Sequence, residues 1–168
     1  DDNKVKSASF DNEKGFGLRG VVDDSVSFYH SSELDDKNVD KAVKLLKKKS
    51  ANKNLDTNNQ LKKNERLYEP HNPINDLKLD EKIKILENIN NYARKLDSAV
   101  KEVSVSLNGN YQNVEIFKKD GISLFDSRPL VRLNVNISVE KKGKVETGSF
   151  GMGGRYGYKK LLTEKNWK

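Results

Sequence analysis

The fold is decided by the stretch Val131-Arg132-Leu133-Asn134-Val135-Asn136-Ile137-Ser138-Val139, in which apolar and polar side chains alternate without a break. Because successive side chains of a β-strand point to opposite faces of a sheet, this pattern predicts a strand with one buried and one solvated face. Lys142-Gly143 then predicts a tight turn, and residues 145–150 continue the extended pattern in the opposite direction. We therefore expect an antiparallel sheet.

Further extended segments precede this strand. Residues 103–107 place apolar side chains on one parity, and residues 114–116 belong to a second extended segment. The Asp120-Gly121 dipeptide that follows is a strong hairpin signal, because glycine adopts the positive φ angles that tight turns need. Residues 122–125 are then expected to form the returning strand.

Two helices are predicted from apolar residues at helical spacing. Residues 79–97 carry the stronger pattern, with apolar side chains three to four positions apart along one face. The other helix begins at Asp35 or Asp36, because a carboxylate there accepts hydrogen bonds from the free amides of the first turn. Residues 39–46 form its apolar face, and the lysines at 47–49 suit the negative end of the helix dipole.

The remaining segments complete the expected order of elements. Residues 4–30 predict a hairpin or meander, with a weak strand at Val5–Phe10 and a turn at Asp23-Asp24-Ser25. Leu67–Ile74 contains two prolines, each of which restricts the backbone, and is expected to be an ordered extended crossing. The order strands, helix, linker, helix, strands indicates an α+β fold with antiparallel sheets and two main helices.

Composition limits the classes of protein that remain. The 168 residues suit one domain or two small ones, and hydrophobic and charged residues each make up 34%, so the core must be modest. The net charge of +7 is concentrated between Lys41 and Lys63, where eight lysines stand against one aspartate. This tract is interpreted as a solvated, Lys- and Asn-rich linker. The alternative is a small basic module that binds nucleic acid or another polyanion through Lys44–Lys63.

Candidate catalytic groups are scarce. The chain has no cysteine, which excludes disulfides, thiolate zinc sites and cysteine nucleophiles within it. Its two histidines, His30 and His71, are far apart, and no zinc motif surrounds either of them. The acidic pairs Asp23-Asp24 and Asp35-Asp36 coincide with a turn and a helix cap. We therefore assign no catalytic and no metal-ligating residue in this chain.

Two stretches are candidate contact surfaces. Gly151–Tyr158 lacks the Gly-Lys-Ser/Thr ending of a phosphate-binding loop, and is interpreted as a structural loop or as a contact with a peptide substrate or partner. Arg128 and Arg132 lie on the same side of their strand, opposite its apolar face. They are interpreted as a solvated or salt-bridged face, or as a contact with a neighbouring domain. The possible substrate or partner contacts are Arg128, Arg132, Gly153, Gly154, Arg155 and Tyr156.

The same stretches carry a resemblance. Arg128–Leu133, followed by a strand, a basic turn and Gly153–Tyr158, is similar to the TldD branch of the TldD/PmbA family. Earlier segments agree with the family in order and spacing. They are Val5–Phe10, Gly15–Arg19, Leu67–Ile74, Glu81–Leu86 and Val100–Leu107. Each motif is weak alone, but the collinear set is specific and covers most of the chain apart from about residues 47–66.

The resemblance implies a bacterial, cytoplasmic zinc metallopeptidase that pairs with a PmbA/TldE-type paralogue and acts on peptides or unfolded segments (proteolysis). The family's zinc ligands come from a His-Glu-x-x-x-His helix that has no counterpart here, so this chain alone is expected to be an inactive fragment without zinc.

The resemblance also implies a domain layout. Residues 1–50 are expected to be part of the family's first domain without its upstream helix and strand, and residues 51–78 a linker. Residues 79–168 are expected to be the central domain, truncated before the metalloprotease domain. Within the family, this portion would help to enclose the active site and contact the partner subunit.

Overall fold

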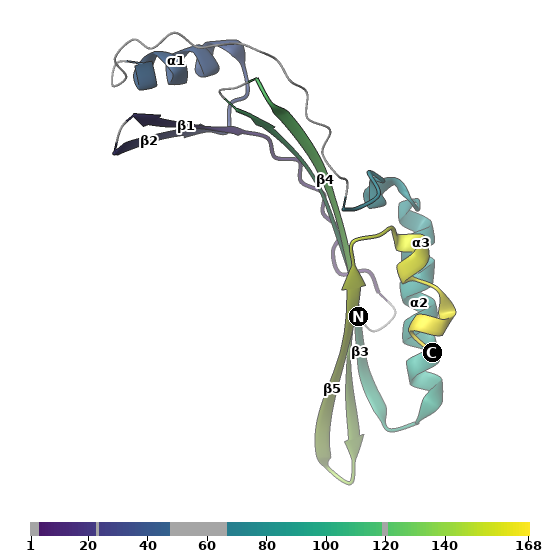
Figure 1. Ribbon diagram of the computed structural model, residues 1–168. Helices are drawn as coiled ribbons and strands as arrows, with labels where there is room; N and C mark the ends of the chain where they lie inside the picture. The colour runs from purple at the N-terminus through teal and green to yellow at the C-terminus, as the bar shows by residue number, and fades with distance from the viewer. Residues whose placement is uncertain (1–3, 23, 48–66, 119–120) are drawn as a thin grey trace. The chain divides into compact units, whose positions relative to one another are not determined.

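The computed structural model describes residues 4–22, 24–47, 67–118 and 121–168. Contacts between residues divide the chain into two units, residues 8–57 and residues 58–168 with 1–7. Each unit combines an antiparallel sheet with helices (Figure 1). The predicted α+β fold class is therefore confirmed.

The smaller unit consists of a hairpin and a helix. The strands β1 (Phe16–Val22) and β2 (Ser25–Ser31) pair antiparallel, as the sequence predicts. The helix α1 (Asp36–Lys47) packs against both strands. Gly20 of β1 faces the side chain of Leu46, and the absence of a side chain on this glycine lets the helix lie close to the strand.

Residues 4–15 form no strand, so the prediction for Val5–Phe10 was wrong. Within the described part of the chain, β1 pairs only with β2, and no strand pairs with residues 5–10. A strand needs the ladder hydrogen bonds of a neighbour to satisfy its backbone groups, and a weak alternation of side chains does not replace them.

Asp35 is the residue that caps α1. The amide of Asn38 donates to Oδ1 of Asp35 at 2.8 Å, and Nδ2 of Asn38 donates to both carboxylate oxygens at 3.1 and 3.0 Å. The amide hydrogen bond, followed by the side-chain hydrogen bond, lowers the pKa of the Asp35 carboxyl. Of the two predicted cap residues, Asp36 is instead the first residue of the helix.

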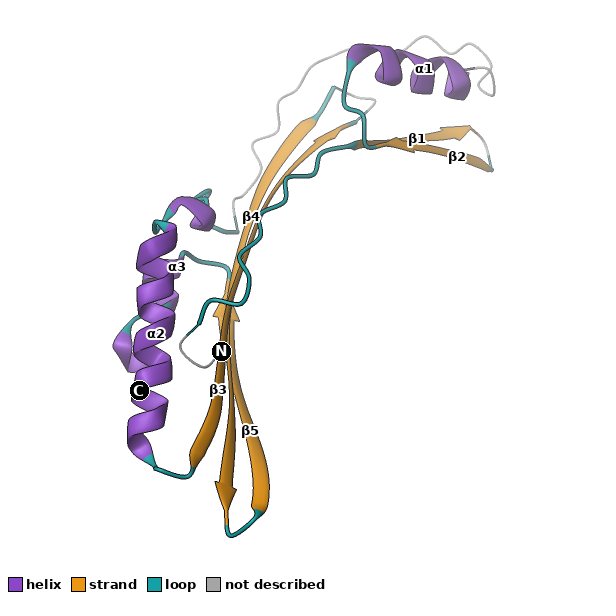
Figure 2. Ribbon diagram, turned by 180° about the vertical axis from the view of Figure 1, so that it is seen from behind, coloured by secondary structure: helices purple, strands orange, loops and turns teal. Residues whose placement is uncertain are grey.

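The larger unit contains an antiparallel sheet in the order β3 (Val100–Phe117), β4 (Ser123–Lys141) and β5 (Lys144–Gly154). Its strands and helices can be followed in Figure 2. The turn between β4 and β5 contains Lys142 and Gly143, whose φ angles of 52° and 75° lie in the left-handed region. The predicted tight turn is therefore confirmed.

β3 and β4 are longer than the sequence pattern indicates. Residues 103–107 and 114–116, expected as separate segments, belong to one continuous strand. Between them, Gly109 pairs with Val131 and Asn110 with Leu130, so that the ladder is not interrupted. Backbone hydrogen bonds hold this stretch extended even though its side chains show no apolar alternation.

α2 (Leu79–Leu96) and α3 (Tyr158–Leu161) lie on the same side of the sheet, as Figures 1 and 2 show. The alternation of β4 is confirmed, because Val131 and Leu133 are fully buried whereas Arg132 is exposed. Each such buried side chain contributes about 1.5–3 kcal/mol relative to an exposed one. The buried members of this core are Ile89, Ala93, Val103, Val131, Leu133, Val135, Tyr158, Leu161 and Leu162.

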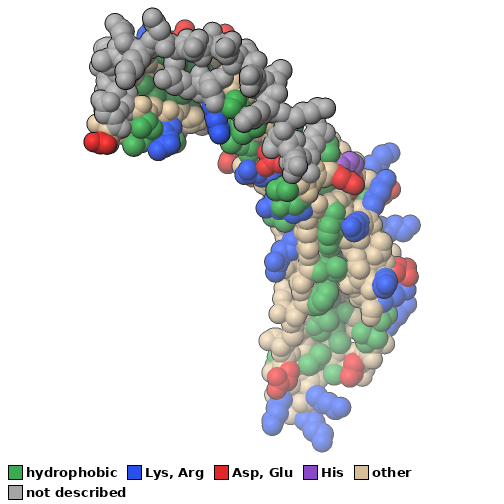
Figure 3. Space-filling view, viewed as in Figure 1, with side chains coloured by type: hydrophobic (Ala, Val, Ile, Leu, Met, Phe, Trp, Pro, Cys, Tyr) green, Lys and Arg blue, Asp and Glu red, His purple; other side chains and the backbone are tan. Residues whose placement is uncertain are grey.

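The surface reflects the same arrangement. On the face shown in Figure 3, hydrophobic side chains gather in a stripe between the sheet and the helices of the larger unit, and Lys and Arg side chains lie along its outer margin. The apolar stripe therefore follows the boundary between the two layers.

Two short helices differ from the sequence interpretation. The sequence interpretation treats Gly151–Tyr158 as a structural loop, but residues 151–154 belong to β5 and α3 begins at Tyr158. Tyr158 and Leu161 are both buried in the core, which stabilises this short helix. The expected extended crossing at Leu67–Ile74 is irregular at residues 69–72 and ends in the 3-10 helix η1 (Pro73–Asn75). In both cases packing outweighs local propensity.

Candidate functional site

Two segments that are far apart in sequence line a shallow hollow of about 430 Å³ in the larger unit. One segment runs through residues 67–76, before α2, and the other through residues 155–160, where β5 leads into α3. The lining residues are Leu67, Tyr68, Glu69, His71, Asp76, Arg155, Tyr156, Gly157, Lys159 and Lys160.

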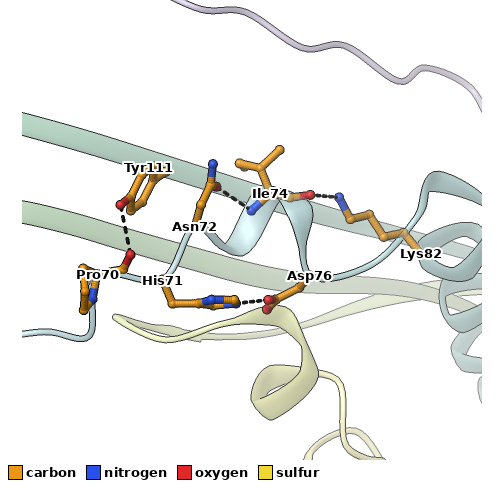
Figure 4. A network of polar contacts seen from close by, with 7 residues as sticks. All are labelled: Pro70, His71, Asn72, Ile74, Asp76, Lys82 and Tyr111. Atoms are coloured by element: carbon orange, nitrogen blue, oxygen red, sulfur yellow. Dashed lines mark hydrogen bonds and ion pairs between the residues drawn. The ribbon is translucent and has the colours of Figure 1, made fainter.

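The first segment is tied to the sheet and to α2 by hydrogen bonds (Figure 4). The hydroxyl of Tyr111 on β3 donates to the Pro70 carbonyl at 3.1 Å. The Ile74 amide donates to Oδ1 of Asn72 at 3.0 Å, and Nζ of Lys82 on α2 donates to the Ile74 carbonyl at 2.9 Å. These contacts tie down a wall of the hollow whose regular secondary structure is the short helix η1.

His71 and Asp76, both in the first segment, form the contact with Gly157 of the second. Nε2 of His71 contacts Oδ1 of Asp76, whose side chain is only 4% exposed, whereas that of His71 is 57% exposed (Figure 4). A Cβ on Gly157 would collide with the Asp76 carboxylate, so the second segment passes directly against it. Burial, and then the charge of Asp76, raise the pKa of the Tyr158 hydroxyl. Asp76 therefore organises the base of the hollow.

Cations and aromatic rings surround the opening. The guanidinium carbon of Arg155 lies 5.4 Å from the centre of the Tyr68 ring, and Nζ of Lys160 lies 5.1 Å from that of Tyr156. Lys159 is exposed beside them. Among the described residues, none of these three cations forms an ion pair with a carboxylate within 4.0 Å. The hollow therefore presents positive charge that the described part of the chain does not neutralise.

The sequence-predicted contact residues divide into those at the hollow and those elsewhere. Arg155 and Tyr156 line it. Gly153 and Gly154 lie at the end of β5 just before it, where a Cβ on Gly153 would collide with the Val131 carbonyl and one on Gly154 with the Tyr156 ring. The two glycines thus permit close packing of the loop.

Arg128 and Arg132 do not line the hollow. Both lie on β4, at positions of opposite parity to the buried Val131 and Leu133. Nε of Arg128 donates to Oδ2 of Asp126 at 2.6 Å, and Nε of Arg132 donates to Oδ1 of Asn134 at 2.7 Å. The Nε donor of each guanidinium is therefore engaged with a neighbour on the same strand.

The sequence interpretation missed several lining residues. It assigned no role to Tyr68, and it found no zinc motif around His71 and gave that residue no other role. Lys159 and Lys160 follow Arg155 and Tyr156 closely, and this mixture of basic and aromatic residues is the signal that would have found them. Nothing in the local sequence indicates that residues 67–71 form the opposite wall.

The described residues do not fit a zinc site. Within them, no group of three His, Cys, Asp or Glu side chains is placed to hold a metal ion. His71 with Asp76 provides two candidate ligands, and His30 belongs to the smaller unit, where it stacks on Phe28 with ring centres 6.0 Å apart. Zinc chemistry is therefore not assigned to these residues.

The predicted basic tract falls largely outside the described residues. Lys41, Lys44 and Lys47 belong to α1, and the lysines from 48 to 63 lie in the part that the structure does not describe. Polyanion binding through Lys44–Lys63 stays a prediction. A steep loss of DNA binding with rising salt, which Lys→Gln changes in this tract should remove, would test it.

No helix among the described residues is long and apolar enough to cross a membrane.

Both units contain a stretch that matches a known protein family. Residues 72–166 match a family described as the PmbA/TldA metallopeptidase central domain, and residues 1–50 match PmbA/TldA metallopeptidase domain 1. A metalloprotease TldD homolog of Haemophilus influenzae is 32% identical over 161 residues, which is 94% of this chain and 33% of the relative. One from Buchnera aphidicola (subsp. Schizaphis graminum) is 30% identical over 164 residues, 95% of this chain and 34% of the relative. The chain thus spans about a third of these relatives.

Proposed function

Because the chain belongs to the TldD/PmbA metallopeptidase family, we propose that it is the non-catalytic, peptide-contacting part of a metallopeptidase that acts on peptides or unfolded segments. The observation that carries this proposal is the hollow between residues 67–76 and 155–160, whose cations lack carboxylate partners among the described residues. Most of its lining lies inside the stretch that matches the family's central domain.

The size and chemistry of the hollow support contact with a peptide. Its volume of about 430 Å³ is within the range of about 300–1,000 Å³ that is usual for ligand sites. Tyr68 and Tyr156 offer apolar ring surface, and Arg155 offers hydrogen-bond donors beside it. A peptide side chain can therefore be held by shape and by charge at once.

The other parts of the proposal rest on the family resemblance. Zinc and its ligands belong to another part of the parent protein, and a PmbA/TldE-type paralogue is the partner subunit, in the cytoplasm. The domain boundaries at residues 50 and 78 are proposed with them. The 168-residue chain is then expected to bind peptides without cleaving them.

A binding and cleavage assay tests the proposal. A short, unstructured, fluorescein-labelled peptide is titrated with the 168-residue chain by fluorescence anisotropy, and mass spectrometry follows the peptide over the same time. We expect saturable binding and an intact peptide. If only a longer chain that includes the zinc-binding part binds the peptide, the proposed contact role of residues 1–168 is wrong.

A further inference from the structure

We infer, on the basis of the proposed peptide contact, that the hollow is a subsite for a carboxylate of the bound peptide, with Arg155 and Lys160 as its principal cations. The carboxylate is either the carboxyl terminus of the peptide or an Asp or Glu side chain. Three features of the lining support this assignment, namely the orientation of Arg155, the anchoring of Lys160 and the engagement of Asp76, whereas the exposed carboxylate of Glu69 opposes it.

Arg155 is held in a way that leaves its donors available. Its guanidinium lies 5.4 Å from the Tyr68 ring centre, and a cation–π contact of this kind does not consume N–H donors. Within the described residues, no hydrogen bond or ion pair from Arg155 to another group occurs. A guanidinium presents its N–H groups in a planar fork that matches the two oxygens of a carboxylate.

Lys159 and Lys160 lie between two residues that are buried in the core. They lie in α3 between Tyr158 and Leu161, which are 4% and 0% exposed and anchor the short helix in the core. The Leu162 amide donates to the Tyr158 carbonyl at 2.8 Å and closes the turn. Fixed backbone positions reduce the entropy that these lysines lose when they bind an anion.

The acidic groups of the hollow do not cancel its positive charge. Asp76 is almost fully buried and is already engaged with His71. Glu69 is exposed on the same lining and forms no ion pair with a described cation within 4.0 Å. Glu69 is therefore the carboxylate that competes with an incoming one by charge repulsion, and its removal should strengthen binding.

Three labelled peptides of the same length test the inference against the 168-residue chain. The first carries glutamate and an amidated carboxyl end. The second carries glutamine in place of the glutamate and is also amidated, and the third carries glutamine and a free carboxyl end. We expect at least one carboxylate peptide to bind about fivefold more tightly than the neutral glutamine peptide, the gain of a favourable exposed charge pair. The peptide that shows the preference identifies the source of the carboxylate.

Three variants locate the effect. Arg155→Gln should remove the preference, whereas Glu69→Gln should increase it, which a general loss of structure could not do. Lys84→Gln is the matched control, because it removes one positive charge from an exposed position on α2 outside the hollow, and it should keep the preference.

The outcomes separate this inference from the proposed function. Equal binding of all three peptides overturns the carboxylate subsite and leaves the peptide contact standing. If Lys84→Gln lowers the preference as much as Arg155→Gln, the preference comes from overall charge and the subsite is also overturned. Absence of binding by every peptide overturns both the subsite and the peptide contact.

Discussion

The two units of the chain are stabilised in different ways. The larger unit has a buried core in which side chains from α2, β3, β4 and α3 meet. Among the described residues of the smaller unit, Ala42 is the buried hydrophobic residue, and Phe28 is 66% exposed. The larger unit therefore depends on packing between distant segments, whereas the described part of the smaller unit depends on local hydrogen bonds in a hairpin and a helix cap.

Ionisable groups show the same difference. In the smaller unit, hydrogen bonds from Asn38, three residues away, lower the pKa of Asp35. In the larger unit, burial in the core raises the pKa of Tyr158, with a smaller effect from Asp76. Local structure thus shifts the pKa of Asp35, and tertiary structure shifts that of Tyr158. Substitutions and changes of pH can therefore test the two units separately.

The largest effect is expected from Leu133→Ala on β4. Leu133 is 0% exposed in the core of the larger unit, so its truncation leaves a cavity and costs about 3 kcal/mol of unfolding free energy. Denaturation in urea measures the loss. Leu130→Ala is the control on the same strand, since Leu130 is 43% exposed, and it should cost clearly less. Equal losses would show that this core does not dominate stability.

The next effect is expected from Gly109→Ala on β3. A Cβ at this position would collide with the hydroxyl of the buried Tyr158 and would lie 3.0 Å from Cδ1 of Ile74. Forcing a methyl group into such a packed place costs about 1–3 kcal/mol.

Two further variants separate this clash from a general effect of replacing glycine. Gly148→Ala on β5 has open space around the new Cβ and should change stability little. Tyr158→Phe removes the nearest atom and should partly restore the Gly109→Ala variant, as a double-mutant cycle would measure. Additive effects of the two substitutions would contradict the proposed contact.

A smaller effect is expected from alkaline pH on the larger unit. The pKa of Tyr158 is higher in the folded chain than the value of about 10 in the unfolded chain. Its contribution to stability is therefore complete below about pH 10 and is lost as the pH rises from there through the folded pKa. The difference in unfolding free energy between wild type and Tyr158→Phe should fall above about pH 10, and a constant difference would contradict this.

The smallest effect is expected at the cap of α1. The pKa of Asp35 is lower in the folded chain, so its contribution is present above the unfolded value and is lost as the pH falls through the folded one. Asp35→Ala should speed amide exchange at Asn38 and Val39 and leave the core of the larger unit unchanged. Asp36→Ala is the control, and it should affect these amides less.

The sequence predicts the candidate site only in part. Of the glycine-rich stretch that was interpreted as a loop, residues 151–154 instead end β5, and residues 155–157 connect it to α3. The parity of Arg128 and Arg132 correctly places them opposite the apolar face of β4. The sequence does not predict that the ring of Tyr68 contacts the Arg155 guanidinium. These two residues are far apart along the chain, because α2 and all three strands of the sheet lie between them in the sequence.

The sequence by itself determined the strand alternation of Val131–Val139, the tight turn after it, a helix capped by Asp35 or Asp36, and the family. Each of these depends on neighbours within a few residues or on a collinear pattern. Only the tertiary structure decided that α3 begins at Tyr158 and that residues 67–76 face residues 155–160. Those features follow from the burial of Tyr158 and Leu161 and from the close passage of Gly157 by Asp76. Such contacts exist only after β3, β4 and β5 have brought distant segments together.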